Sequence, residues 1–166
     1  MQRVGLGYDL HRLVPGRPLV LGGLKIDHPL GLAGHSDADA VLHAITDAIL
    51  GACGEGDIGD LFPDSDPRWT GADSAQFVRR ALELAAARGL SVANCDVTIL
   101  AEQPPLGPLK AKMRLRIAEL LGVTADAVSV KAKTGEGIGA IGRGEGIAAL
   151  AVVLLVHAEG ADKSSR

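Results

Sequence analysis

Apolar and polar residues follow regular periods along most of this chain, and these periods predict a mixture of strands and helices. Alternation over residues 2–8 and 91–101 predicts strands, because successive side chains of a strand point to opposite faces. Two short apolar runs in residues 18–27, separated by a Gly-Gly pair, predict a hairpin. Residues 128–132 predict another strand. Residues 147–156 are aliphatic without clear alternation, which predicts a strand buried on both faces or partly at a subunit contact.

The first predicted helix follows a short polar segment. Ser36 is the expected N-cap, and Asp39, three residues later, completes an arrangement like a capping box. The helix is expected to end at Gly51 or Gly54. Its inward-facing residues share helical spacing and are Val41, Leu42, Ile45, Ile49 and Leu50.

Two more helices follow, separated by loops. Asp73-Ser74 is expected to begin the second helix, which ends at Gly89, and the third ends near Leu121. Residues 54–72 are rich in Gly, Asp and Pro, which predicts an ordered loop or a mobile flap. Strands and helices alternate without a strict βαβ repeat or a dinucleotide fingerprint, and residues 134–146 are Gly-rich.

These elements predict an α+β fold with one mainly four-stranded sheet and helices on one face. A chain of 166 residues fits one domain, which we assign to residues 1–157, with residues 158–166 as a disordered tail. The 47% hydrophobic content is sufficient for a core, although only 2% of residues are aromatic. That core must therefore be built from Leu, Val, Ile and Ala.

Composition also narrows the classes of partner. The net charge of −3, the absence of a basic stripe and the scarcity of aromatic residues argue against nucleic-acid binding. The longest apolar run, 147–156, is too short to span a bilayer, and no secretory signal is recognisable at the N-terminus. Cys53 and Cys95 lie in apolar contexts without CxxC spacing, so we expect buried free thiols in a reducing cytoplasm.

A candidate metal site comes from two of these elements. Asp9 and His11 lie two apart in a strand pattern, and Asp39 and His43 lie four apart in a helix pattern, so each pair shares a face. Two imidazoles and a carboxylate can supply three ligands and leave a fourth position open, as a catalytic zinc site requires. The alternative is a satisfied polar cluster at a strand end. Asp39 and Asp47 bracket His43, either as carboxylates that fix its tautomer or as ordinary polar helix positions.

Three further segments have side chains suited to phosphate, sugar or cation. His35 and Ser36 lie at a predicted helix start, where free N–H groups favour a phosphate, although capping alone would explain Ser36. Residues 56–66 are acidic and turn-rich, which suits a polyol, a cation or simply a solvated loop. Residues 131–136 and 142–146 combine cations, a hydroxyl and carboxylates on a Gly-rich backbone, which suits polyphosphate with a hard cation; glycines in turns are the alternative.

Taken together, these segments resemble the 2-C-methyl-D-erythritol 2,4-cyclodiphosphate synthase family of the non-mevalonate isoprenoid pathway. The resemblance extends over roughly residues 2–157. It rests on five colinear motifs: Gly5 to His11; Gly34 to Asp39 with His43-Ala44 and Thr46 to Ala48; Gly56 to Gly59 with Phe62 to Asp64; Val97 to Ile99; and Val130 to Ala132 with Gly142 to Gly146.

The resemblance implies a role for each matching position. The family's zinc ligands correspond to Asp9, His11 and His43, and its two transition-state-stabilising positions to His35 and Thr134. Positions that hold the phosphate and methylerythritol side of the substrate correspond to Ser36, Asp57, Ile58, Gly59, Phe62, Pro63, Asp64, Ser65 and Asp66. Positions on the cytidine side, at the second cation and at a central cavity that can hold an isoprenoid phosphate correspond to Ala101, Leu106, Lys133, Gly135, Glu136 and Arg143.

The implied activity is that of a zinc-dependent phosphorus–oxygen lyase. It would convert 4-diphosphocytidyl-2-C-methyl-D-erythritol 2-phosphate to the 2,4-cyclodiphosphate and release CMP. Each chain would bind one zinc ion, and Glu136 would hold a second divalent cation, Mg or Mn. The family is a homotrimer, with sheets that face the threefold axis. A zinc phosphohydrolase and a catalytically silent trimeric nucleotide-binding module are the two alternatives.

Overall fold

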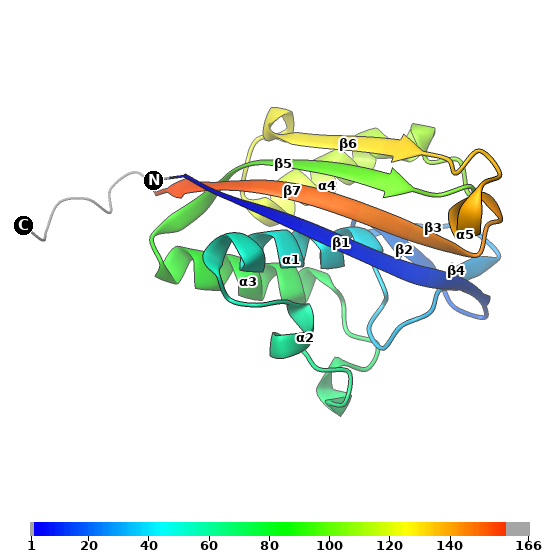
Figure 1. Cartoon of the computed structure of the whole chain (residues 1–166), viewed down its shortest axis with the longest axis horizontal. Coiled ribbons are helices and arrows are strands. Elements are labelled where there is room, and N and C mark those ends of the chain that lie inside the picture. The colour runs from blue at the N-terminus through cyan, green and yellow to red at the C-terminus, as the bar shows by residue number, and fades with distance from the viewer. Residues whose placement is uncertain (1, 159–166) are drawn as a thin grey trace, which may run out of the picture.

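Strand β1 (Gln2–Pro15) organises the fold, which a computed structural model describes for residues 2–158 (Figure 1). It belongs to a five-stranded sheet in the order β4-β1-β7-β5-β6. The other strands of this sheet are β4 (Leu30–Leu32), β5 (Leu90–Leu100), β6 (Val128–Lys133) and β7 (Gly146–His157). Only the β5–β6 pair is parallel. A separate hairpin of β2 (Leu19–Leu21) and β3 (Leu24–Ile26) turns at the two predicted glycines.

The prediction of a mainly four-stranded sheet was therefore one strand short. Strand β4 has only three residues, too few for any alternation to be visible in the sequence. Strand β1 is also longer than the predicted residues 2–8, because it pairs first with β7 and then, from Leu13 onward, with β4. The polar residues Asp9, His11 and Arg12 interrupt the apolar pattern but not the strand.

The helices cover one face of this sheet (Figure 1). The long ones are α1 (Ala40–Cys53), α3 (Ala75–Ala87) and α4 (Lys110–Leu121). Short helical turns lie in the connections: α2 (Ile58–Leu61), η1 (Pro67–Trp69), η2 (Gly107–Leu109), η3 (Ala125–Ala127) and α5 (Gly139–Gly142). All five residues predicted for the inward face of the first helix are buried. None of the helices in residues 2–158 combines the length and the apolar character needed to cross a membrane.

The start of α1 differs from the prediction. Its N-cap is Asp39 rather than Ser36, and the Asp39 carboxylate accepts hydrogen bonds from the backbone N–H groups of Val41 and Leu42, both at 3.1 Å. The helix cannot begin earlier because Ala38 has a left-handed backbone (φ 58°). The Ser36 hydroxyl is therefore available to the His43 ring, whose Nε2 lies 3.1 Å away.

Two glycines of β1 let α1 rest directly on the strand. A Cβ added at Gly5 would lie 1.8 Å from the Ala48 carbonyl oxygen, and one added at Gly7 would lie 1.9 Å from that of Ala44. Side chains at these positions would push the helix away from the sheet. The close approach brings the residue before Ala44, His43, to the strand that carries Asp9 and His11.

We expect Gly7→Ala to destabilise the fold by about 2–3 kcal/mol, because α1 or β1 must move to admit the methyl group. Gly51→Ala is the matched control: a Cβ at this exposed helical position meets nothing within 4 Å, so the change should stabilise the chain by up to about 1 kcal/mol. Urea denaturation measures both. Equal stability of Gly7→Ala and the unchanged protein would contradict the tight helix–strand packing.

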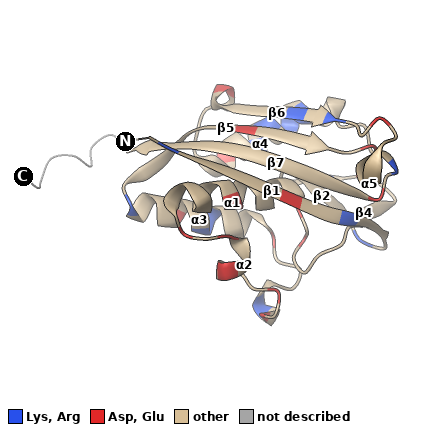
Figure 2. Ribbon diagram, viewed as in Figure 1, with Lys and Arg blue, Asp and Glu red and all other residues tan. Residues whose placement is uncertain are grey.

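The face of the sheet opposite the helices carries exposed apolar side chains. On β1 they are Val4, Leu6, Tyr8 and Leu10, with Leu6 63% exposed and paired in register with Val152 of β7, itself 41% exposed. Burial along β7 alternates from Leu150 onward, so the prediction of a strand buried on both faces is not met within one chain. Figure 2 shows β7 without a charged residue. Large exposed apolar patches of this kind mark interaction surfaces.

Both cysteines are free and buried, as predicted. Burial raises the pKa of the Cys95 thiol to about 12, so this thiol stays protonated and unreactive at neutral pH. The tail predicted for residues 158–166 lies outside the described residues except for Ala158.

Candidate metal centre and its cavity

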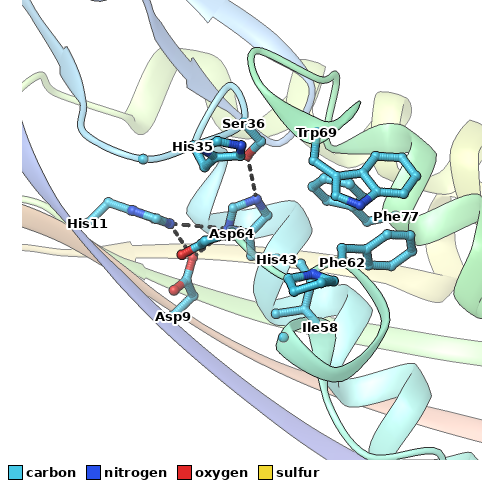
Figure 3. Close-up of a pocket in the computed structure, with 13 residues that line it drawn as sticks. Asp9, His11, His35, Ser36, His43, Ile58, Phe62, Asp64, Trp69 and Phe77 are labelled. Carbon is cyan, nitrogen blue, oxygen red and sulfur yellow. Dashed lines mark hydrogen bonds and ion pairs between the residues drawn. The ribbon is translucent and has the colours of Figure 1, made fainter. Parts of the chain in front are cut away.

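Three side chains from β1 and α1 meet between the C-terminal half of β1 and the first turn of α1 (Figure 3). Asp9 Oδ2 lies 2.8 Å from His11 Nε2 and 2.9 Å from His43 Nδ1. The two imidazole nitrogens are 3.1 Å apart. Asp9 and His11 share a strand face, as their spacing predicted, and His43 reaches them from α1.

The outer nitrogen of each imidazole is occupied by a hydrogen-bond partner. His11 Nδ1 lies 2.7 Å from the Ala33 carbonyl oxygen, which can only accept, so this nitrogen carries the proton. His43 Nε2 lies 2.9 Å from the hydroxyl of Ser74 and 3.1 Å from that of Ser36. The inner nitrogens, His11 Nε2 and His43 Nδ1, lie beside Asp9, where each can offer a lone pair to a metal ion.

Three lone-pair donors that converge in this way fit a metal ion. A tetrahedral zinc shell with bonds of about 2.0 Å separates neighbouring ligand atoms by about 3.3 Å, close to the observed spacings. The ligand set of two imidazoles and one carboxylate suits zinc, with the fourth position free. The three residues therefore fit a zinc ion.

The same geometry favours positive charge at the cluster when no metal is bound. Burial alone would lower the pKa of His11, but the hydrogen bond and charge of Asp9 outweigh it and raise that pKa. Burial would raise the pKa of Asp9, but the hydrogen bonds and charges of His11 and His43 hold it well below its usual range. A metal ion would have to displace a proton here, so its affinity should fall in acid.

A cavity of about 380 Å³ opens beside the triad, a size that suits a small-molecule ligand. It brings together most of the residues predicted for the methylerythritol and phosphate side. Its lining consists of Asp9, His11, Gly34, His35, Ser36, His43, Ile58, Gly59, Phe62, Pro63, Asp64, Trp69 and Phe77. The acidic loop and the segment before α1, far apart in sequence, therefore share one cavity.

The segment predicted as an ordered loop or a mobile flap is ordered by aromatic packing. Phe62 lies with its ring centroid 4.5 Å from that of Phe77 on α3 and 5.0 Å from that of Trp69. Two of its predicted substrate residues have other tasks: the Asp57 carboxylate caps α2, and the Asp66 carboxylate caps η1 and pairs with Arg68. These two residues and Ser65 do not line the cavity.

Arg17 fixes the segment that carries His35 and Ser36. Its guanidinium donates to the carbonyl oxygens of Gly34 at 2.7 Å and Ser36 at 2.5 Å. The loop 54–72 contacts the His35 ring, whose Nε2 lies 2.9 Å from the Thr70 hydroxyl. Arg17 could not be predicted from the sequence, because a single Arg in a connecting segment carries no signal of the carbonyl groups that it contacts.

The carboxylates proposed to fix the His43 tautomer have other partners. Asp39 accepts from four backbone N–H groups, two in α1 and two at Gly22 and Gly23. Asp47 accepts from the N–H of Ile58 at 2.8 Å. Among the described residues, the His43 ring is held by Ser36 and Ser74 instead, and Ser74 is a site residue that sequence reasoning missed.

The residues predicted for the cytidine and the second cation form a separate group at the end of β6. Thr134 Oγ1 donates to Glu136 Oε1 at 2.7 Å, and the Gly135 N–H donates to the Glu102 carboxylate at 2.9 Å. Lys133 of β6 and Leu10 of β1 lie on one line across the sheet, because the register of the strands connects them through one residue each of β5 and β7. Three strand spacings, about 14 Å, therefore separate this group from the triad within one chain. Ala101 and Leu106 are buried beside β5 and η2.

Arg143 lies in the Gly-rich segment before β7. Its Nε donates to Glu145 Oε1 at 2.6 Å, a pairing that lowers the pKa of the exposed Glu145 carboxyl. Arg143 is therefore already neutralised within its own chain.

The fold and the triad define a single-domain α+β protein with a candidate metal centre in a ligand-sized cavity. The chain belongs to the YgbB family, whose model matches residues 2–156. A 2-C-methyl-D-erythritol 2,4-cyclodiphosphate synthase from Symbiobacterium thermophilum is 56% identical over 152 residues, which cover 92% of this chain and 97% of that protein.

Solved structures agree with this placement. A 2C-methyl-D-erythritol-2,4-cyclodiphosphate synthase in its CDP-bound form matches with a TM-score of 0.86 at 44% identity, over 93% of this chain and 100% of that one. The bifunctional IspDF from Campylobacter jejuni matches with a TM-score of 0.89 at 40% identity, over 93% of this chain and 42% of that one. The present chain therefore corresponds to one part of the bifunctional relative.

Proposed function

We propose that this protein is a zinc-dependent phosphorus–oxygen lyase that converts 4-diphosphocytidyl-2-C-methyl-D-erythritol 2-phosphate to 2-C-methyl-D-erythritol 2,4-cyclodiphosphate and CMP. The observation that carries the proposal is the convergence of three lone-pair donors, Asp9, His11 and His43, on a cavity that also contains His35 and Ser36. Family membership and the names of the relatives support the same reaction. We place this step of isoprenoid precursor synthesis in the cytoplasm.

In this reaction the 2-phosphate of the substrate attacks the β-phosphorus and CMP leaves. Asp9, His11 and His43 would hold the zinc ion, which when bound supplies Lewis-acid polarisation of a phosphate. A phosphate monoester has its second pKa at about 6, so the attacking group is already largely ionised at neutral pH. The chain then needs no nucleophile of its own, and its task is to position the substrate and neutralise charge.

The phosphate-binding role falls to His35 and Ser36. Ser36 Oγ accepts a hydrogen bond from the Ala38 N–H, and the residue lines the cavity, so its hydroxyl proton is available to a phosphate oxygen. His35 lies at the cavity wall in contact with Thr70 and is suited to stabilise developing charge. Arg17 holds this segment through the carbonyl oxygens of Gly34 and Ser36, on either side of His35.

The methylerythritol moiety would occupy the rest of the cavity. Ile58 and Phe62 offer apolar surface to its methyl group, and the Asp64 carboxylate can accept from its hydroxyls. Gly59 and Pro63 shape the wall between them. Asp57, Ser65 and Asp66, which lie outside the cavity, would act through the backbone and the caps that hold the loop.

We also propose a homotrimer in which each active site forms between two chains. Thr134 and Glu136 are separated from the triad of their own chain by about 14 Å of sheet. A neighbouring copy can supply them, and the uncovered apolar face over β1 and β7 offers the surface for that contact. Cytidine would then bind beside Ala101, Leu106, Lys133 and Gly135 of the neighbour, with Thr134 as the second stabilising residue.

Two charged residues complete the proposal. Glu136 would hold a second divalent cation, Mg or Mn, against the diphosphate. Arg143 would lie near the threefold axis, where its pairing with Glu145 leaves anion capture as a secondary role.

The proposal is tested by incubating the pure protein with the substrate and Mg²⁺ and following the products by ³¹P NMR. We expect equal amounts of CMP and cyclic diphosphate. A product that incorporates ¹⁸O from labelled water would instead indicate a phosphohydrolase. Nucleotide binding without turnover would indicate a silent binding module.

Glu136→Gln should raise the Mg²⁺ concentration needed for half-maximal turnover by about tenfold or more, because a neutral amide is a weaker ligand for a hard cation. Zinc content should stay near one per chain. The matched control is Glu83→Gln, an exposed carboxylate on α3 that pairs with Arg80 at the surface. An unchanged Mg²⁺ response of Glu136→Gln would show that the second cation is held elsewhere.

A further inference from the structure

Ser74 lies at the start of α3 but does not cap it. A serine at an N-cap normally accepts a hydrogen bond from a backbone N–H of the first turn. Here the Ser74 side chain makes no such bond, and Asp73 accepts from the Ala75 N–H at 2.8 Å instead. Ser74 is completely buried, and its hydroxyl points toward His43 and Asp37.

The directions of these hydrogen bonds follow from chemistry. An ionised carboxylate can only accept, so Ser74 donates its hydroxyl proton to Asp37 Oδ1. The backbone N–H of Ser74 donates to the other carboxylate oxygen at 3.1 Å, which fixes Asp37 against the helix start. With its only proton used, the Ser74 oxygen must accept from His43 Nε2 at 2.9 Å.

We propose that Asp37 and Ser74 form a relay that positions His43 and fixes its tautomer, and that this relay sets the zinc affinity of the site. The inference rests on the proposed zinc centre and adds two positioning residues to it. Because Nε2 carries the proton, Nδ1 keeps a lone pair for the zinc ion at its position beside Asp9 and His11. The Asp37 charge, transmitted through the hydroxyl, also makes His43 a stronger ligand.

The relay joins two segments that are 37 residues apart in sequence. Asp37 belongs to the segment before α1, and Ser74 to the start of α3. The hydrogen bond between them therefore connects the C-terminal end of the loop 54–72 to the metal site. Ser36 gives His43 a second, longer contact at 3.1 Å. Removal of Ser74 should therefore weaken the site without abolishing it.

The test measures zinc affinity directly, by competition with a chelator at fixed pH, so that it does not depend on turnover. Ser74→Ala should weaken zinc binding by about 10- to 100-fold, the usual effect of losing such a partner. Asp37→Asn, which keeps the size of the side chain but removes its charge, should weaken it by a smaller factor. In ¹⁵N NMR of the wild type, His43 should show a protonated Nε2, and Ser74→Ala should broaden or shift that signal.

Asp73→Ala is the matched control, because it removes the cap of the same helix without touching His43. It should lower thermal stability and leave zinc affinity unchanged. Zinc affinity of Ser74→Ala within twofold of the wild type, or an equal loss in Asp73→Ala, would overturn the relay while leaving the proposed function intact. A wild-type protein that does not bind zinc would contradict the proposed function and the relay with it.

Discussion

His43→Ala should remove zinc from the protein and lower turnover by on the order of 10³-fold, because two remaining ligands cannot hold the ion that polarises the phosphate. The fold should survive. The core is built from aliphatic residues of the sheet and helices, and His43 lies at its edge with 9% of its surface exposed. Metal analysis, circular dichroism and CMP release measure the three outcomes.

The control for this variant is His157→Ala, at the exposed end of β7 and far along the sheet from the triad. It should retain both zinc and activity. Full zinc occupancy in His43→Ala would show that the triad is a structural polar cluster, which is the alternative that the sequence left open.

Leu6→Lys should convert the proposed trimer to single chains and lower turnover by at least about 10²-fold, even though Leu6 lies on the opposite face of β1 from Asp9. In the proposed assembly Leu6 is buried against a neighbouring chain, and an unpaired ammonium group there is strongly unfavourable. Zinc should remain bound, because all three ligands come from one chain. Light scattering gives the mass, and metal analysis the zinc content.

Leu115→Lys is the matched control, because it also replaces an exposed leucine with lysine but does so outside the proposed interface. Leu115 is 58% exposed, similar to Leu6, but it lies on α4 in the helical layer. This variant should keep a mass near three chains and full activity. An active monomer of Leu6→Lys would contradict active sites shared between subunits.

The Asp9–His11 half of the triad could be predicted from the sequence because both residues lie in one strand, where a spacing of two places their side chains on the same side. The Asp39–His43 spacing was less informative, because Asp39 caps the helix from outside it and only His43 joins the triad. The sequence could not show how closely α1 approaches β1. That distance depends on Gly5 and Gly7, whose role becomes visible only when the carbonyls opposite them are known.

The errors arose where a residue's partner is distant in the chain. Ser36 matched the pattern of an N-cap, but the left-handed backbone at Ala38 moves the helix start to Asp39. Ser74 matched the pattern of a cap as well, and its true partners are Asp37 and His43. Short polar side chains have many possible local partners, so sequence alone does not rank them.

The aromatic packing that orders the flap has a practical consequence. Trp69 is the single tryptophan of the chain, and it lies in the cavity wall against Phe62 and Phe77. The tryptophan fluorescence of this protein therefore comes from one indole, at the place where the substrate would enter. The molecule contains its own optical probe for ligand entry, and titrations need no added label.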